Sequence, residues 1–192
     1  LHVCDKNLEQ IEPIKITNTH NLLVDVCQAA KYEGQSITRY YQKYRAKYND
    51  SPSQICTVLA RSFADIGDII RGKDLYLGYD DEEKKQREKL EKNLKDIFGN
   101  IYKDVMRGSN GKTLQERYQN DTPDFFQLRE DWWALNRQQV WKALTCEAPD
   151  NAKYFRHTCG AGEKRTETYY KCQCVNRGDV PTNFDYVPQY LR

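Results

Sequence analysis

Apolar residues recur at three- and four-residue steps along much of this 192-residue chain, and this spacing constrains the fold most strongly. The clearest apolar stripe consists of Ile55, Cys56, Leu59, Phe63, Ile66 and Ile70. Such a stripe occupies one face of an α-helix, and that face must be buried against another element. Comparable patterns start near residues 18, 80 and 122. The sequence therefore predicts a mainly α fold with little or no β structure.

Short polar residues and prolines mark the expected helix starts. Asn18, Ser51 and Thr122 are the expected N-caps, and proline follows each of the last two. Gly34 is expected to interrupt the first helix before an aromatic, basic second part. Gly72 is expected to end the next helix in a left-handed conformation.

The helix expected after Thr122 has the largest aromatic content. Trp132 and Trp133 are adjacent, so their side chains cannot share one helix face. Both sides of this helix should therefore be covered, which places it at the centre of the core. From residue 146 onward the helical period is lost, and glycine, charge and cysteine dominate. Residues 146–192 are expected to form a long irregular loop region tied by disulfides.

Seven cysteines indicate either an oxidising compartment or a metal site. They are Cys4, Cys27, Cys56, Cys146, Cys159, Cys172 and Cys174. The spacing leaves their connectivity open, and the odd number leaves one unpaired within the chain. Zinc ligation by His157, Cys159 and the Cys172/Cys174 pair is the alternative, but paired ligands of structural zinc usually have two to four residues between them. Disulfides are therefore favoured, with no metal and no cofactor.

Basic side chains are the expected ligand-binding residues. With 30 basic and 28 acidic residues the formal charge is only +2, which argues against a dedicated nucleic-acid binder. The local clusters are Arg39 and Lys43 with Arg45 and Lys47; Lys84, Lys85 and Arg87 with Lys89; and Lys153, Arg156, Lys164, Arg165 and Lys171. Each is either a solvated surface or a site for a polyanion such as a sulfated polysaccharide, whose binding would fall with salt.

No catalytic constellation is expected. His2, His20 and His157 accompany no nucleophile motif, and there is no phosphate-binding glycine loop. Asp65 and Asp68 share a helix face, which favours an ion-paired or solvated surface over acid–base chemistry. No apolar run reaches the length needed to cross a bilayer, so any membrane anchor is expected outside this chain. These features favour an exported binding module over an enzyme.

Several segments resemble the Duffy-binding-like domains of malaria parasites. They are residues 60–69 (ARSFADIGDI), 131–133 with Asn136-Arg137 and Val140-Trp141, 172–174 (CQC), 23–27 and 29–34. The final residues 185–192 (DYVPQYLR) are similar to the alpha class at the head of the Plasmodium falciparum erythrocyte membrane protein 1 variant adhesins. The resemblance covers nearly the whole chain, and its motifs are long and specific.

The resemblance implies a disulfide-stapled helical bundle of the Duffy-binding-like type. Residues 1–192 would be a partial domain: 1–15 would end the first subdomain, 16–192 would form the middle one, and the C-terminal subdomain would be absent. The quoted motif residues would mostly be buried scaffold. Export to the outer face of the infected erythrocyte membrane is also implied, with antigenic variation and exposure to host antibodies.

The function implied by the resemblance is cell adhesion, through rosetting or cytoadherence. The expected partners are host erythrocyte or endothelial glycans such as heparan sulfate and blood-group sugars, or protein receptors, together with neighbouring domains of the same chain. The alternative is a structural platform that positions and shields a neighbouring receptor-binding domain. The two hypotheses differ in whether the folded fragment binds host cells by itself.

Overall fold

The computed structural model describes residues 6–9, 11–16, 18–48, 53–76, 78, 80–107, 111–176 and 178–192. The α-helices in these ranges are α1 (Lys6–Glu9), α2 (Thr19–Tyr48), α3 (Ser53–Arg71), α4 (Asp81–Arg107), α5 (Gly111–Tyr118) and α6 (Phe126–Thr145). Three short 3-10 helices are η1 (Pro13–Lys15), η2 (Phe184–Tyr186) and η3 (Gln189–Leu191). The only β structure among the described residues is two isolated bridges. The expected mainly α fold is confirmed.

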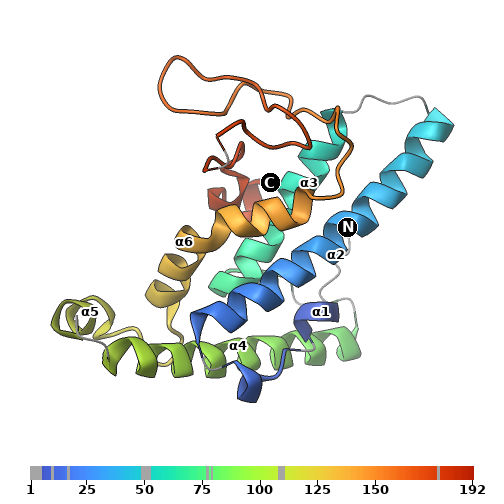
Figure 1. Ribbon diagram of the computed structural model, residues 1–192. Coiled ribbons are helices and arrows are strands. Elements are labelled where there is room, and N and C mark those ends of the chain that lie inside the picture. Colours follow the sequence, from blue (N-terminus) through green and yellow to red (C-terminus); the bar gives the residue numbers. More distant parts are fainter. Residues whose placement is uncertain are drawn as a thin grey trace.

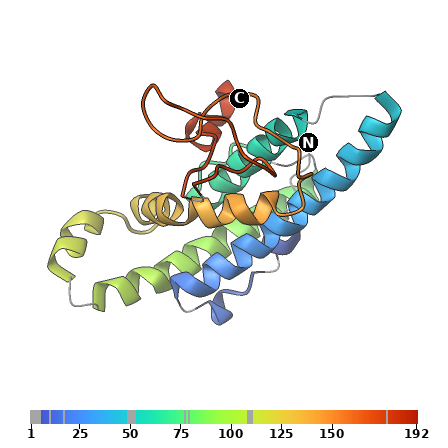
Figure 2. The same ribbon diagram turned by 45° about the horizontal axis from the view of Figure 1, so that its top comes forward.

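Helix α6 lies at the centre of the arrangement. It packs against α2 most extensively and then against α3, while α4 contacts α1, η1 and α5 and touches α6. Figures 1 and 2 show α4 along one side of the molecule and the irregular chain after α6 on the opposite side. No helix of the described chain is long and apolar enough to cross a membrane.

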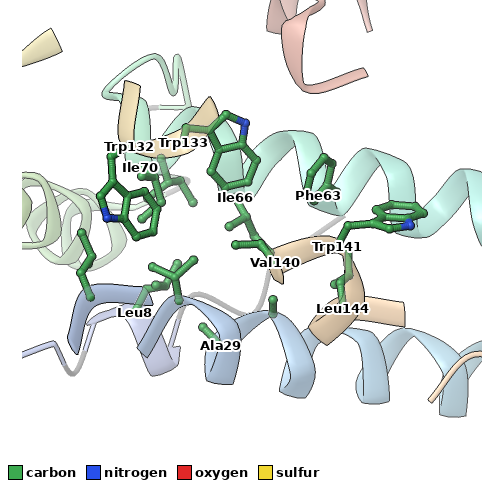
Figure 3. Close-up of a cluster of buried hydrophobic side chains, with 14 of the residues drawn as sticks. Leu8, Ala29, Phe63, Ile66, Ile70, Trp132, Trp133, Val140, Trp141 and Leu144 are labelled. Atoms are coloured by element: carbon green, nitrogen blue, oxygen red, sulfur yellow. The ribbon is translucent and has the colours of Figure 1, made fainter. Parts of the chain in front are cut away.

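The core forms where aromatic side chains of α6 meet the apolar stripe of α3. Figure 3 shows Trp133 and Trp141 from α6 on either side of Phe63 from α3. The Phe63 ring centroid lies 5.2 Å from that of each tryptophan. Trp132 faces the other way and packs edge-on against Phe98 of α4, with centroids 6.2 Å apart. Both adjacent tryptophans are buried, as the sequence predicted.

Two glycines allow α6 to approach its neighbours closely. A Cβ atom on Gly34 of α2 would lie 1.8 Å from the Leu144 carbonyl oxygen, and one on Gly67 of α3 would lie 2.8 Å from Cζ2 of Trp133. The predicted interruption at Gly34 is wrong, because α2 is continuous from Thr19 to Tyr48. Glycine is required at position 34 because it has no side chain, so the backbones of α2 and α6 can touch there.

Local hydrogen bonds support two of the predicted helix boundaries. The Asn21 amide donates to Oδ1 of Asn18 at 3.0 Å, which is the expected cap of α2. Gly72 has φ +69° just after the last residue of α3, as expected for a C-terminal glycine. Ser51 and Pro52 lie outside the described residues, so the predicted cap of α3 stays a prediction.

The predicted start of α6 at Thr122 is wrong, since the helix begins at Phe126. Its first amides are instead capped by Asp121. The Gln127 and Leu128 amides donate to the two carboxylate oxygens of Asp121 at 2.7 and 2.8 Å. A carboxylate that accepts from free amides at a helix start is favoured by both hydrogen bonding and the helix dipole. The cap therefore comes from an acidic residue one position before the threonine.

Replacing Gly34 by Ala should test the close approach of α2 and α6. We expect Gly34→Ala to lower the free energy of unfolding by about 1–3 kcal/mol, because the added methyl group collides with backbone that cannot move freely. The measurement is denaturant unfolding of the oxidised protein. Ser36→Ala, at an exposed position of the same helix, is the control. Equal stabilities of the two variants would contradict the predicted contact.

Candidate functional surface on the disulfide-tied loop

One disulfide attaches the chain after α6 to the helical body, and a second disulfide joins two parts of that chain to each other. Cys56 of α3 is bonded to Cys172, and Cys159 is bonded to Cys174. Because Cys159, Cys172 and Cys174 are oxidised, they are not available as zinc ligands. The described residues contain no group of three or more His, Cys, Asp or Glu that could hold a metal ion.

The remaining described cysteines, Cys27 and Cys146, carry free thiols. This differs from the expectation of a single unpaired cysteine. Cys172 and Cys174 take Cys56 and Cys159 as partners, which leaves Cys27 of α2 and Cys146, just after α6, unpaired. Burial raises the pKa of both thiols, so neither has the low pKa of a reactive cysteine. Cys4 lies outside the described residues.

The loop folds back on itself as a narrow hairpin. The Cys159 and Thr166 backbones exchange two hydrogen bonds, of 3.0 and 2.9 Å, and residues 160–165 form the tip. Gly160 and Gly162 have φ values of +90° and +72°, a conformation that glycine adopts without strain. The Gly160 amide also donates to a carboxylate oxygen of Asp179 at 3.2 Å. The tip is therefore exposed, while its base is fixed by a disulfide and backbone hydrogen bonds.

The loop cations differ in whether they pair with other groups of the protein. Lys153 pairs with Glu167 at 3.0 Å, and Lys171 donates to the Cys146 carbonyl oxygen at 3.0 Å. Exposed Arg156 lies over the ring of its neighbour Phe155, 5.1 Å from its centroid. The side chains of Lys164 and Arg165 are exposed at the tip and pair with no other described residue. We call Phe155, Arg156, Lys164, Arg165 and Tyr169 the loop surface; its two aromatic side chains are 58% and 67% exposed.

The predicted cluster on α4 is divided by an internal ion pair. Lys84 and Lys85 are exposed, whereas Arg87 pairs with Asp74 and lies over the Tyr76 ring, 4.5 Å from its centroid. This contact ties the segment after α3 to α4. Arg87 borders a groove of about 480 Å³ between these two elements. Its guanidinium is thus partly used for scaffold contacts, and it is less available to an external anion than the two lysines.

The predicted residues do not form one site. Arg39 and Lys43 are exposed on α2, and neither pairs with another described residue. The side chains of Arg45 and Lys47 are outside the described part of the chain. The α4 cluster and the loop lie on opposite sides of the molecule (Figure 1). Ligand binding by any of the three clusters therefore stays a prediction, and each cluster has to be tested separately.

A buried carboxylate, which the sequence reasoning missed, positions the chain that follows the loop. Asp185 has a fully buried side chain. One of its oxygens accepts from Nε1 of Trp133 at 2.9 Å and from Nε of Arg137 at 2.7 Å. The other accepts from a terminal nitrogen of Arg137 at 2.7 Å, which makes a two-point pair. Arg71 donates to the backbone carbonyl oxygen of Asp185.

The same buried charges continue along α3. Arg71 pairs with Asp68 at 2.9 Å, and Arg192 pairs with Asp68 and, at 3.4 Å, with Asp65. Burial raises the pKa of the Asp65 carboxyl group, and the Arg192 charge partly offsets this rise. The expected ion pairing of the two aspartates is observed, but Asp68 is buried rather than solvated. We call the five side chains of Asp68, Arg71, Arg137, Asp185 and Arg192 the charge network.

Taken together, the helical core, the disulfide that attaches the loop to it and the disulfide within the loop define a disulfide-stapled helical domain with exposed cations at the loop tip. The sequence model of the Duffy binding domain matches residues 1–192. The chain therefore belongs to the Duffy binding domain family. A search of curated protein sequences found no match.

Solved structures agree with this assignment. The N-terminal NTS-DBL1-alpha and CIDR-gamma double domain of the PfEMP1 protein from the Plasmodium falciparum varO strain is 40% identical, with a TM-score of 0.76. The ICAM-1-binding PfEMP1 IT4var13 DBLbeta domain is 32% identical, with a TM-score of 0.67. Another PfEMP1 DBLb domain, bound to human ICAM-1, is 33% identical over 77% of this chain and 28% of its own, with a TM-score of 0.55.

The likeness extends over almost all of this chain but only part of each relative. Coverage is 99% of this chain and 25% of the varO double domain, and 100% of this chain and 39% of the IT4var13 domain. The predicted resemblance to PfEMP1 Duffy-binding-like domains is thus confirmed, as is the disulfide-stapled helical fold.

The charge network predicts a large loss of stability on removal of its central carboxylate. We expect Asp185→Ala to lower the free energy of unfolding by about 3–5 kcal/mol, because the largely buried Arg137 guanidinium would lose its partner and the buried Trp133 Nε1 would lose its acceptor. Denaturant unfolding would measure the loss, and Glu163→Ala at the exposed tip is the control. Asp185→Asn, which keeps a hydrogen-bond acceptor for Trp133, should lose less. A stability of Asp185→Ala equal to that of the control would refute the role assigned to the network.

Proposed function

We propose that this domain is an adhesion module that binds an anionic glycan of the heparan sulfate type on host cells, using the loop surface. Its place is then the outer face of the infected erythrocyte membrane, as its similarity to PfEMP1 domains suggests. The observation that carries the proposal is the exposure of basic side chains at the tip. Lys164 and Arg165 are exposed side by side, without a carboxylate partner among the described residues. Arg156, also exposed, adds a third cation on the same loop.

The geometry favours the loop over the other basic clusters as the glycan site. Sulfate groups are recognised by charge, and an arginine can donate two parallel hydrogen bonds to one of them. Cations that are already paired within the protein lose part of this capacity, as Arg87 does through Asp74. The tip cations are free, and the Cys159–Cys174 disulfide limits the number of conformations that the loop must give up on binding. These properties support the loop surface as the primary contact.

A protein receptor is the second candidate, and a different observation favours it. Phe155 and Tyr169 are exposed beside the loop cations. Aromatic residues and arginine are enriched in protein–protein interfaces. Two of the similar PfEMP1 domains are described by their ability to bind ICAM-1. This candidate predicts binding that depends on the aromatic side chains and changes little with salt.

Binding of the oxidised protein to red cells and to immobilised heparin, across a salt series, separates these candidates. The triple variant R156A/K164A/R165A should weaken heparin binding by about ten-fold or more, because three charge-assisted contacts are lost. Its remaining binding should also depend less on salt. The matched control is K84A/K85A, which removes exposed lysines from α4 on the opposite side of the molecule.

Each outcome has a defined meaning. Equal losses in the loop variant and the control would contradict the loop as the glycan site. Red-cell binding that survives salt and soluble heparin, but is lost in F155A/Y169A, would replace the glycan by a protein receptor. If the folded fragment binds no cells, the adhesion proposal fails for this fragment, and the platform that positions a neighbouring domain takes its place.

A further inference from the structure

We propose that the hairpin tip is a cleavage site for a trypsin-like serine protease, and that the cleaved domain stays in one piece. The enzyme would hydrolyse the peptide bond after Lys164 or Arg165. One water molecule is consumed, and the products are a new carboxylate on the basic residue and a new amine on the next one. This inference does not rest on the proposed glycan binding, since it uses only the exposure and covalent topology of the loop.

The tip meets the conformational requirement for proteolysis. A protease must hold several residues around the cut in an extended conformation, so exposed loop tips are cleaved before helices. Residues 160–165 are all exposed, and a Cβ atom on Gly162 would meet nothing within 4 Å. The inter-strand bonds between Cys159 and Thr166 lie at the base, so the tip can move without breaking them. Trypsin-like enzymes accept lysine or arginine before the cut, and the tip presents both.

Several other basic residues in the described irregular segments are held by contacts. Lys73 is paired with Glu130, and Lys153 with Glu167. Lys171 is only partly exposed and precedes Cys172, whose amide donates to the Ala152 carbonyl oxygen at 2.9 Å. The closest competitor is Arg156, which is exposed but lies over Phe155. Among these residues, Lys164 and Arg165 are the pair with neither a side-chain partner nor a fixed backbone.

Both disulfides cross the proposed cut. Cys56 and Cys159 belong to the fragment 1–165, and their partners Cys172 and Cys174 belong to the fragment 166–192. The smaller fragment also contributes Asp185 and Arg192 to the charge network. None of these contacts involves residues 160–165. Cleavage should therefore open the tip while the helical body, the disulfides and the charge network remain in place.

The consequence is a domain whose tip is opened while its fold is kept. Cleavage turns one closed hairpin into two chain ends, so the tip residues are no longer held next to one another. Any ligand that requires the intact tip would then bind less well, whereas surfaces on α2 and α4 would be unchanged. An extracellular protease could thus disrupt one exposed surface of the domain and leave the others intact.

Limited digestion of the oxidised protein with trypsin tests this inference. The first product should have the mass of the intact chain plus one water under non-reducing conditions, and helical circular dichroism should be retained. After reduction it should separate into fragments that meet at residue 164 or 165. In K164Q/R165Q the rate of this first cut should fall at least about ten-fold, because the protease pocket rejects an uncharged side chain. R156Q, the matched control, should be cut at the tip at the rate of the unmodified protein.

Two results would overturn the proposal. One is a first cut elsewhere in the chain, with the tip still intact. The other is release of the fragment 166–192 without reductant, which would show that the disulfides do not join the two parts. Because the side chains of Lys164 and Arg165 are exposed and pair with no other described residue, K164Q/R165Q should fold normally. A loss of helical circular dichroism in that variant would also contradict the proposal, since the tip would then contribute to the fold.

Discussion

Withdrawing a carboxylate from water costs several kcal/mol, so Asp185 stays buried only because Arg137 and Trp133 donate to it. These donors come from α6. Arg137 also donates to the Thr182 carbonyl oxygen at 2.9 Å, and Arg71 of α3 donates to the Asp185 carbonyl oxygen. Asp185 and these two arginines therefore hold the chain after the loop against α3 and α6.

The network lies where α3, α6 and the chain after the loop pack closely enough to bury most of its charges. Gly67 brings α3 against Trp133, and Gly34 brings α2 against the last turn of α6. In a low-dielectric environment each ion pair is stronger, but an unpaired charge is more costly. Core packing and charge pairing thus meet at Gly67, which contacts Trp133 and accepts a hydrogen bond from Arg71 through its carbonyl oxygen.

Above this body the loop has the opposite character. Two disulfides fix its base, and the tip exposes cations that the body does not neutralise. Such a division lets surface residues change without disturbing the fold, so one scaffold can serve different ligands. The similar domains that bind ICAM-1 have this fold at 31–33% identity, which shows how far the sequence can vary around it. Ligand choice therefore has to be argued from exposed side chains and not from the shared fold.

Local patterns in the sequence were enough to predict the four long helices α2, α3, α4 and α6, although not all of their bounds, because periodicity and capping involve residues only a few positions apart. Such local patterns are the three- and four-residue spacing, the adjacent Trp132 and Trp133, and the helix ends at Asn18 and Gly72. The family was also evident from the sequence, since its motifs are contiguous strings. Oxidised cysteines were expected as well, although their partners were not.

What only the tertiary structure decided involves residues far apart in the chain. The Cys56–Cys172 disulfide joins positions separated by 116 residues, and Trp133 and Asp185 are separated by 52. Gly34 was expected to break a helix because local propensity disfavours glycine there, but contact with α6 outweighs that preference. In the sequence Arg87 belongs to a basic cluster with Lys84 and Lys85, but in the structure it pairs with Asp74. Periodicity carries no information about which distant charges and thiols meet, because that depends on how the helices pack.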